Sequence, residues 1–255
     1  MEIPERIGVI GSQISVCDTN RALGFLQAKA EQGGGGYVCF TNVHGTVMGR
    51  RDAGFRDITN QSLLSLADGK PVYWMGRLHG AGDLGHVPGP DFMLAALRRF
   101  PYKRHYFYGS TPEVLRSLES SLRAQIPGLT VCGTHSPPFL PQSAAELGRD
   151  LQAIRDSGAD FVWVGLGAPK QERWMATHWR ALAPAVLLGV GAAFDFHAGN
   201  LKRAHSALRF MGLEWLHRLV QEPRRMWKRY LLTNSLFLFY VTRDSVMGRG
   251  ERKRA

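Results

Sequence analysis

The stretch FVWVGLGAPKQE, residues 161–172, decides the fold class of this chain. Its first four residues, Phe161–Val164, are large and apolar, which predicts a buried strand. The glycine-containing turn that follows leads into a helix whose first turn contains Glu172. A buried strand, a tight turn and a helix in this order are typical of α/β domains.

The same alternation of apolar runs and helical stretches extends along the chain in both directions. Helical periodicity predicts helices over Glu113–Ala124 and Ala144–Ser157. Short apolar runs predict five further strands, at Tyr37–Thr41, Pro71–Met75, His105–Tyr108, Leu129–Cys132 and Ala185–Val190. We therefore expect an α/β fold with one open, mostly parallel sheet covered by helices on both faces, and ligands at the carboxyl ends of the strands.

The composition is that of a folded protein of a reducing compartment. The 255 residues are 44% hydrophobic and 21% charged, enough apolar surface for a core and too much for a disordered chain. No apolar run approaches the ~18 residues of a membrane span, and the first residues, with Glu2 and Glu5, do not form a basic export leader. The cysteines at 17, 39 and 132 are too scattered for a disulfide framework.

The positive charge is concentrated at the C-terminal end. Residues 200–255 hold 13 Lys and Arg against 4 Asp and Glu, whereas residues 1–199 hold 19 against 17. This divides the chain into a nearly neutral body, 1–199, and a basic appendage, 200–255, which predicts a polyanionic partner: nucleic acid, an anionic membrane face or a phosphorylated ligand. The appendage is predicted to be helical over Leu201–Val241, with Pro223 opening a new helix and Leu231–Val241 suited to a membrane interface.

The turn at Gly165–Gly167 has two interpretations. Its backbone N–H groups could cradle a phosphate, with Lys170 adding a full charge and the helix N-terminus a partial one. It could equally be a plain strand-to-helix turn, because its spacing is neither that of a P-loop nor the dinucleotide pattern GxGxxG.

Four polar side chains in predicted loops next to strands are further candidates. Asp195 could bind a ribose or sugar hydroxyl, or cap the turn after it. Asp68 lies just before the predicted strand Pro71–Met75 and could act as a general base, or belong only to an Asp-Gly turn. Asn42 and His44 follow a strand end, where side chains reach a ligand crevice, and His44 could be catalytic or an ordinary loop histidine.

Several chemistries are excluded by the motifs. The chain has no Asp-x-Asp pair, no HExxH or HxH spacing and no GxSxG elbow, which disfavours metal-dependent sugar transfer, a tightly held transition metal and that class of hydrolase. The residues by themselves therefore indicate an α/β anion-binding enzyme with a basic tail.

A set of motifs in a fixed order resembles the WecG/TagA/CpsF glycosyltransferases. It runs from about Tyr37 to Leu232. The motifs are Asn42-Val43-His44, Ala67-Asp68-Gly69, Pro88-Gly89-Pro90-Asp91, Gly165–Glu172 (GLGAPKQE), Gly191–Gly199 (GAAFDFHAG), Arg203-Ala204, Gly212–Arg218 (GLEWLHR) and Glu222–Tyr230 (EPRRMWKRY). The combination is far more specific than any single glycine motif.

This resemblance implies a bacterial enzyme that transfers a hexose or N-acetylhexosamine-type sugar from a UDP-sugar to a polyprenyl-diphosphate-linked saccharide. It also implies inversion at the anomeric carbon, a Rossmann-like fold, no essential metal or other cofactor, and peripheral attachment to the inner face of the cell membrane. The product would enter a cell-surface polysaccharide such as a teichoic acid or a capsule. The family can self-associate, so a homo-oligomer is a further expected partner.

The resemblance also assigns roles to individual residues. Asp68 matches the family's proposed catalytic carboxylate. The family's threonine position holds Phe40, so Thr41 is carried over as a catalytic candidate with a one-residue offset, and strand side chains alternate between faces. His86 stands where relatives often have an arginine. The residues carried over to the nucleotide-sugar site are Asn42, Gly109, Gly165, Gly167, Lys170, Gln171, Glu172 and Asp195.

In the appendage, four basic residues match positions of the family that are thought to meet the lipid diphosphate: Arg218, Arg225, Lys228 and Arg229.

Two other classes of function are weighed against a glycosyltransferase. A pI near 10.0 suits a nucleic-acid-binding protein, but the tail interleaves its charges with Trp215, Trp227 and a Leu/Phe run, so no nucleic-acid partner is expected. A nicotinamide-dependent oxidoreductase is disfavoured by the missing dinucleotide motif.

Overall fold

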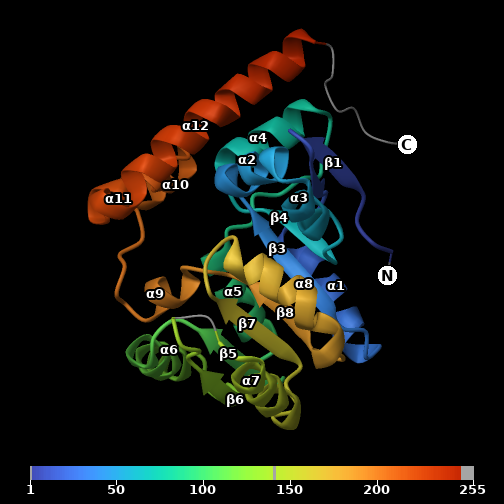
Figure 1. Cartoon of the computed structure of the whole chain (residues 1–255), viewed down its shortest axis with the longest axis vertical. Helices are drawn as coiled ribbons and strands as arrows, with labels where there is room; N and C mark the ends of the chain where they lie inside the picture. The colour runs from blue at the N-terminus through green and yellow to red at the C-terminus, as the bar shows by residue number, and fades with distance from the viewer. Residues whose placement is uncertain (1, 140–141, 248–255) are drawn as a thin grey trace. The chain divides into compact units, whose positions relative to one another are not determined.

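The computed structural model describes residues 2–139 and 142–247 (Figure 1). The chain divides into two compact units, which are described separately. The first consists of Asn20–Cys39 and Gly89–Asn200, and the second of Glu2–Thr19, Phe40–Pro88 and the C-terminal residues from Leu201. The basic appendage thus shares a unit with two earlier segments, and its separate function stays a prediction.

The first unit is built on parallel strands. Its strands lie in the order β3-β8-β7-β5-β6, with bounds β3 Gly36–Thr41, β8 Val186–Gly189, β7 Phe161–Gly165, β5 His105–Gly109 and β6 Val131–His135. The strand β3 runs on into the second unit, where β4 (Leu64–Ala67) is its neighbour and completes a six-stranded sheet. The expected α/β fold with a parallel sheet is confirmed.

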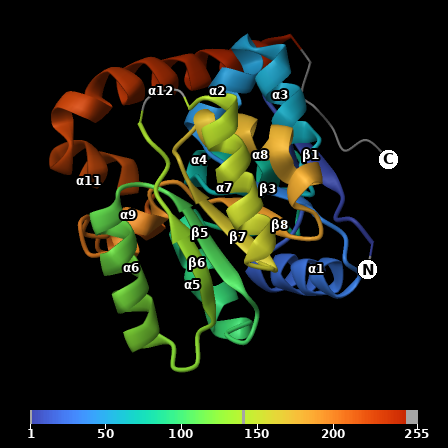
Figure 2. The ribbon, with the colours of Figure 1, turned by 60° about the horizontal axis from the view of Figure 1, so that its bottom comes forward.

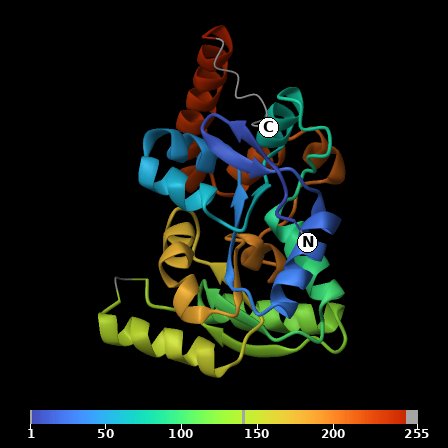
Figure 3. The same cartoon turned by 90° about the vertical axis from the view of Figure 1, so that its right-hand side faces the viewer.

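Helices flank these strands in two groups. The helix α7 (Ala144–Asp156) packs against α8 (Lys170–Leu182), whereas α9 (Ala193–His197) packs against α5 (Gly89–Arg99) and α6 (Pro112–Gln125), as Figure 2 shows. Figure 3 shows α7 and α8 on one side of the strands, and α5 and α1 (Thr19–Glu31) on the other. Burial on both faces explains why the inner strands are continuously apolar in sequence.

Two strand predictions need correction. Pro71–Met75 is not a strand but part of α4 (Lys70–Leu78), because Pro71 stands in the first helical turn, where its missing N–H costs nothing. Only Val72 and Gly76, one turn apart, are buried there, which is the burial pattern of a helix. The predicted strand Leu129–Cys132 is displaced to β6, an edge strand whose half-exposed residues carry no apolar signal. The predicted helices at 113–124 and 144–157 are confirmed.

The second unit has a core of its own, to which its C-terminal helix contributes. An antiparallel hairpin joins β1 (Arg6–Val9) to β2 (Ser12–Ser15), and its two turn residues, Ile10 and Gly11, have φ values of 44° and 95°. Positive φ at both turn residues is the geometry of a tight hairpin turn. The remaining helices are α2 (Val43–Arg51), α3 (Ala53–Asn60), α4, α10 (Ser206–Phe210), α11 (Glu214–Gln221) and α12 (Pro223–Val246).

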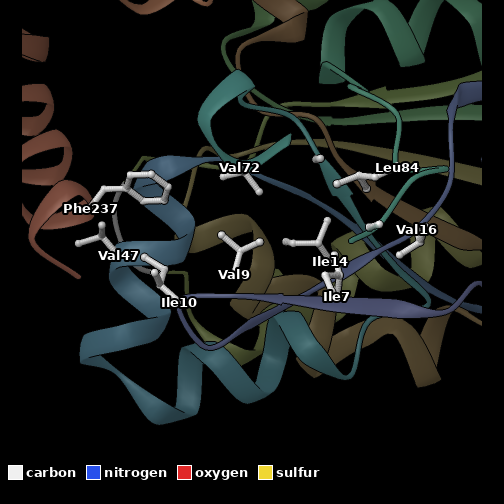
Figure 4. Close-up of a cluster of buried hydrophobic side chains, with 11 residues drawn as sticks. Ile7, Val9, Ile10, Ile14, Val16, Val47, Val72, Leu84 and Phe237 are labelled. Atoms are coloured by element: carbon white, nitrogen blue, oxygen red, sulfur yellow. The ribbon is translucent and has the colours of Figure 1, made fainter. Parts of the chain in front are cut away.

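Phe237 ties α12 into this core. The helix begins at Pro223, as predicted, and lies along α2. Phe237 is only 5% exposed and belongs to the same hydrophobic cluster as Val47, Ile7 and Ile14 (Figure 4). Burial of a phenylalanine contributes on the order of 2 kcal/mol to the stability of the fold. The helix α12 is therefore part of the folded core of this unit, in addition to presenting basic side chains.

A buried histidine in β5 makes the stability of the first unit sensitive to pH. His105 is fully buried, accepts a hydrogen bond on Nδ1 from the indole N–H of Trp163 (3.2 Å), and donates from Nε2 to the carbonyl oxygen of Phe100 (2.9 Å). Both ring nitrogens are thus satisfied only in the neutral form. Burial lowers the pKa of His105 from 6.5 to about 4, against the opposing influence of the Phe100 carbonyl and Asp160.

We expect the free energy of unfolding to fall as the pH drops from 6.5 to about 4. In this range His105 binds a proton in the unfolded chain but stays neutral in the native protein. The loss from this residue would total about 3 kcal/mol and would be absent above pH 6.5. Urea unfolding across this range measures it. His105→Gln should have a shallower slope than the wild type, and equal slopes would contradict the assignment.

Candidate active site

The backbone of Asp68 is held on both sides within the second unit. Asp68 follows directly after β4, and its N–H donates to the carbonyl oxygen of Thr41 at 3.0 Å. Its own carbonyl oxygen accepts a hydrogen bond from Nε2 of His86 at 2.9 Å. The residue therefore lies at the carboxyl end of a strand, the usual place for a functional group in a parallel sheet, rather than before a strand as predicted.

Asn42 orients the carboxylate of Asp68. Its side-chain Nδ2 donates to Oδ2 of Asp68 at 3.2 Å, while its Oδ1 accepts from the N–H of Gly45 and caps α2. The Asn42 amide is thus restrained at both ends, and one hydrogen bond to a carboxylate oxygen restricts the rotation of the Asp68 side chain. Its predicted contact with the nucleotide sugar stays a prediction.

The hydroxyl of Thr41 lies inside the sheet. Thr41 is 3% exposed, and its Oγ1 is 2.7 Å from Oγ of Ser65 on β4. This contact gives Thr41 a structural role in the pairing of β3 with β4. Its predicted catalytic role stays untested.

The phenol of Tyr230 on α12 lies within electrostatic range of Asp68 and of two arginines from the C-terminal helices. Burial raises the pKa of Tyr230; Arg218 and Arg229 oppose the rise, and Glu222 and Asp68 add to it. One phenol is therefore within electrostatic range of two guanidinium groups and of the Asp68 carboxylate. Sequence reasoning assigned Tyr230 no role, although its position four residues after buried Met226 places it on the inner face of α12.

His44 lies in the same electrostatic environment and stays neutral. Burial, together with the positive charge of Arg229, lowers the pKa of His44 to about 4. Its Nδ1 is buried and has no hydrogen-bond partner within the described part of the chain. At neutral pH the imidazole therefore carries no charge.

The four basic residues predicted to meet a lipid diphosphate have different surroundings in the structure. Arg218 and Arg229 lie near Tyr230, and Arg218 also pairs with Glu222, with Nε 3.3 Å from Oε2. Lys228 is exposed, with Nζ 5.5 Å from the centre of the Trp227 ring. Arg225 belongs to α12, but its side chain lies outside the described residues.

In the first unit, glycine allows strand ends to approach closely. A Cβ on Gly109 would lie 2.6 Å from the carbonyl carbon of Gly165, and one on Gly165 would lie 2.5 Å from the ring of Phe194. Gly167 has a φ of +77° but faces open space. Gly109 and Gly165 are therefore needed for packing, and Gly167 for its backbone conformation.

The turn after β7 is braced by the buried side chain of Gln171. Its Oε1 accepts from the N–H of Gly167 at 3.1 Å, while its Nε2 donates to the Gly189 carbonyl at 2.7 Å and to Glu172 at 3.0 Å. A phosphate at the Gly167 amide would compete with this hydrogen bond. Lys170, the first residue of α8, is exposed and places a full positive charge at this turn.

Asp195 lies in the first turn of α9, and its carbonyl oxygen accepts from the N–H of Asn200. The sugar-binding role predicted for Asp195 stays a prediction.

The described residues do not suggest a resident metal or a membrane span. Within residues 2–139 and 142–247, no three His, Cys, Asp or Glu side chains are grouped as metal ligands. Among the helices in these ranges, none has the length and apolar character to span a bilayer.

Comparison with known proteins places the chain among the glycosyltransferases. Residues 7–251 match the model of the "Glycosyl transferase WecG/TagA/CpsF family", and the chain belongs to this family. A relative from Bacillus subtilis (strain 168) is described as "N-acetylglucosaminyldiphosphoundecaprenol N-acetyl-beta-D-mannosaminyltransferase". It is 31% identical over 185 residues, which cover 71% of this chain and 69% of that protein. The resemblance inferred from the motifs is confirmed.

Proposed function

We propose that this protein is an inverting glycosyltransferase that moves a hexose or N-acetylhexosamine-type sugar from a UDP-sugar to a polyprenyl-diphosphate-linked saccharide. The name of the Bacillus subtilis relative supports a lipid-diphosphate acceptor and an N-acetylhexosamine as the transferred group. The observation that carries the proposal is the Asp68 carboxylate, oriented by Asn42 and within electrostatic range of the Tyr230 phenol, which Arg218 and Arg229 also approach. The product would serve the synthesis of a cell-surface polysaccharide.

In the proposed reaction Asp68 is the general base. It takes the proton of the acceptor hydroxyl while that oxygen attacks the anomeric carbon of the donor sugar. The bond from the anomeric carbon to the diphosphate oxygen breaks, and UDP leaves with the electron pair. A single displacement of this kind inverts the anomeric configuration and requires only one carboxylate as base.

The negative charge of two diphosphates must be balanced by the protein. Arg218 and Arg229 are the candidates for binding the acceptor diphosphate, because one guanidinium group can donate two parallel hydrogen bonds to phosphate oxygens. Lys170 and the N-terminus of α8 are the candidates for the UDP that departs, since both place positive charge at the turn after β7. With these charges in place, we expect turnover to need no added metal.

The outward face of α12 supports attachment to an anionic membrane surface. Trp227, Leu231 and Leu238 lie on one helical face and are 49%, 64% and 65% exposed. Arg224 and Lys228 are exposed beside them. Apolar side chains flanked by basic ones suit the boundary between acyl chains and anionic headgroups, so we propose a peripheral position on the inner membrane face.

Turnover with defined substrates tests this proposal. The purified chain, incubated with a short-chain polyprenyl-diphosphate N-acetylglucosamine and a panel of UDP-sugars, should release UDP with one donor strongly preferred. NMR of the product should show the inverted anomeric configuration, and added EDTA should not stop the reaction. Binding of duplex DNA or NADH in place of a UDP-sugar would overturn the assignment.

A further inference from the structure

A group of exposed apolar side chains in the second unit lies outside α12. Trp74 and Leu78 of α4 are 44% and 77% exposed, and Phe210 and Met211 at the end of α10 are 80% and 51% exposed. We refer to these four residues as the α4–α10 patch. Soluble monomeric proteins rarely leave adjoining large apolar side chains open to water unless they bind something.

The four side chains belong to one surface. Trp74 and Leu78 are one helical turn apart and share a face of α4. A Cβ on Gly212 would lie 2.9 Å from the tip of the Trp74 ring, so the end of α10 passes close over α4. The Nζ of Lys70 is 5.7 Å from the centre of the Phe210 ring, a second link between the two helices.

Basic residues outnumber acidic ones in the two segments that form the patch. Residues 70–83 contain Lys70 and Arg77 against one acidic residue, the exposed Asp83. Residues 201–213 contain three basic residues and no acidic one, and the next residue, Glu214, is paired with Arg203 at 2.8 Å. Like charges on two such surfaces repel each other, so this patch is complementary to a negatively charged surface rather than to a second copy of itself.

We propose that the α4–α10 patch is a bilayer contact additional to the outward face of α12, with its apolar side chains among the acyl chains and Lys70 and Arg77 at anionic headgroups. This rests on the proposed function, which places the enzyme at a membrane. It extends that function to a helix that begins two residues after Asp68, so lipid contact would restrain the segment leading away from the proposed base.

Partition onto vesicles of phosphatidylcholine mixed with phosphatidylglycerol tests the patch. Leu78→Glu places a charge where a leucine would enter the acyl region, and we expect it to weaken partition about tenfold. Tyr102→Glu is the matched control, because Tyr102 is 64% exposed but belongs to the first unit, and it should bind as the wild type does. Turnover of Leu78→Glu with a short-chain acceptor in solution should remain normal.

A variant of α12 separates failure of the patch from failure of the proposed function. If Leu231→Glu loses binding while Leu78→Glu keeps it, the α4–α10 patch is not a lipid contact, although the protein still binds membranes. If the wild type does not bind these vesicles at all, both the patch and the peripheral attachment are wrong.

A polarity-sensitive dye reports the contact directly. Attached at Leu78→Cys in a Cys132→Ser background, it should shift its emission to the blue when vesicles are added. The other two cysteines, Cys17 and Cys39, are buried and should not react. A blue shift that appears with rising protein concentration and no lipid would show a contact between copies and would overturn the proposal.

Discussion

Replacing Asp68 by asparagine is expected to lower the rate of sugar transfer by about 10³-fold, because the reaction would lose its general base. The asparagine side chain has nearly the same shape, so the cap that Asn42 forms on α2 should survive. Affinity for the UDP-sugar should change no more than several fold, since the base acts on the acceptor hydroxyl. Initial rates of UDP release and calorimetric titration of the donor measure the two quantities.

Asp83→Asn is the matched control for this experiment. Asp83 is an exposed carboxylate of the same unit, and its loss changes the net charge equally. It should leave the rate unaltered. Full turnover by the Asp68 variant would remove Asp68 from the mechanism, and an equal loss in both variants would point to net charge rather than to a base.

The second large effect is expected on stability, at Gly109. Alanine there would adopt a φ of +121° and place its Cβ 2.6 Å from a backbone carbon of Gly165. Left-handed strain and overpacking against backbone should together lower the free energy of unfolding by about 3 kcal/mol. Urea denaturation with unchanged far-UV circular dichroism of the native state is the measurement.

Gly128→Ala separates the two causes of this loss. Gly128 also has a positive φ, +81°, but a Cβ there meets nothing within 4 Å. Only the conformational strain remains, so the loss should be about 1 kcal/mol. Equal losses at the two glycines would mean that the close approach of β5 and β7 is not what requires Gly109.

Much of the first unit could be predicted from sequence because its inner strands are buried on both faces and so are continuously apolar. The strands β3, β5, β7 and β8 were found in this way. The strand β4 was missed, and α4 was mistaken for a strand, because short apolar runs do not distinguish a buried strand from a buried helix face. The edge strand β6 was displaced because it needs no apolar pattern.

In the candidate site, sequence reasoning singled out Asp68 and the basic residues as candidates but did not identify the residues that contact them. It gave Asn42 a ligand role, which stays a prediction, and did not foresee that the same amide holds Asp68 from 26 residues away. It left open whether the Gly165–Gly167 turn binds a phosphate, and it did not foresee that the Gly167 amide is hydrogen-bonded to Gln171. It assigned Tyr230 no role at all, because nothing in a local pattern relates that phenol to a carboxylate 162 positions earlier.

The amino-acid sequence by itself determined the fold class, the family and the concentration of positive charge in the last 56 residues. These properties are recorded in neighbouring residues, through periodicity, motif spacing and composition. Only the tertiary structure decided that Phe237 completes the core of the second unit, that Asn42 orients Asp68, and that Trp74 and Phe210 share a surface. Those relations join residues remote in the chain, and their energy exists only once the segments pack together.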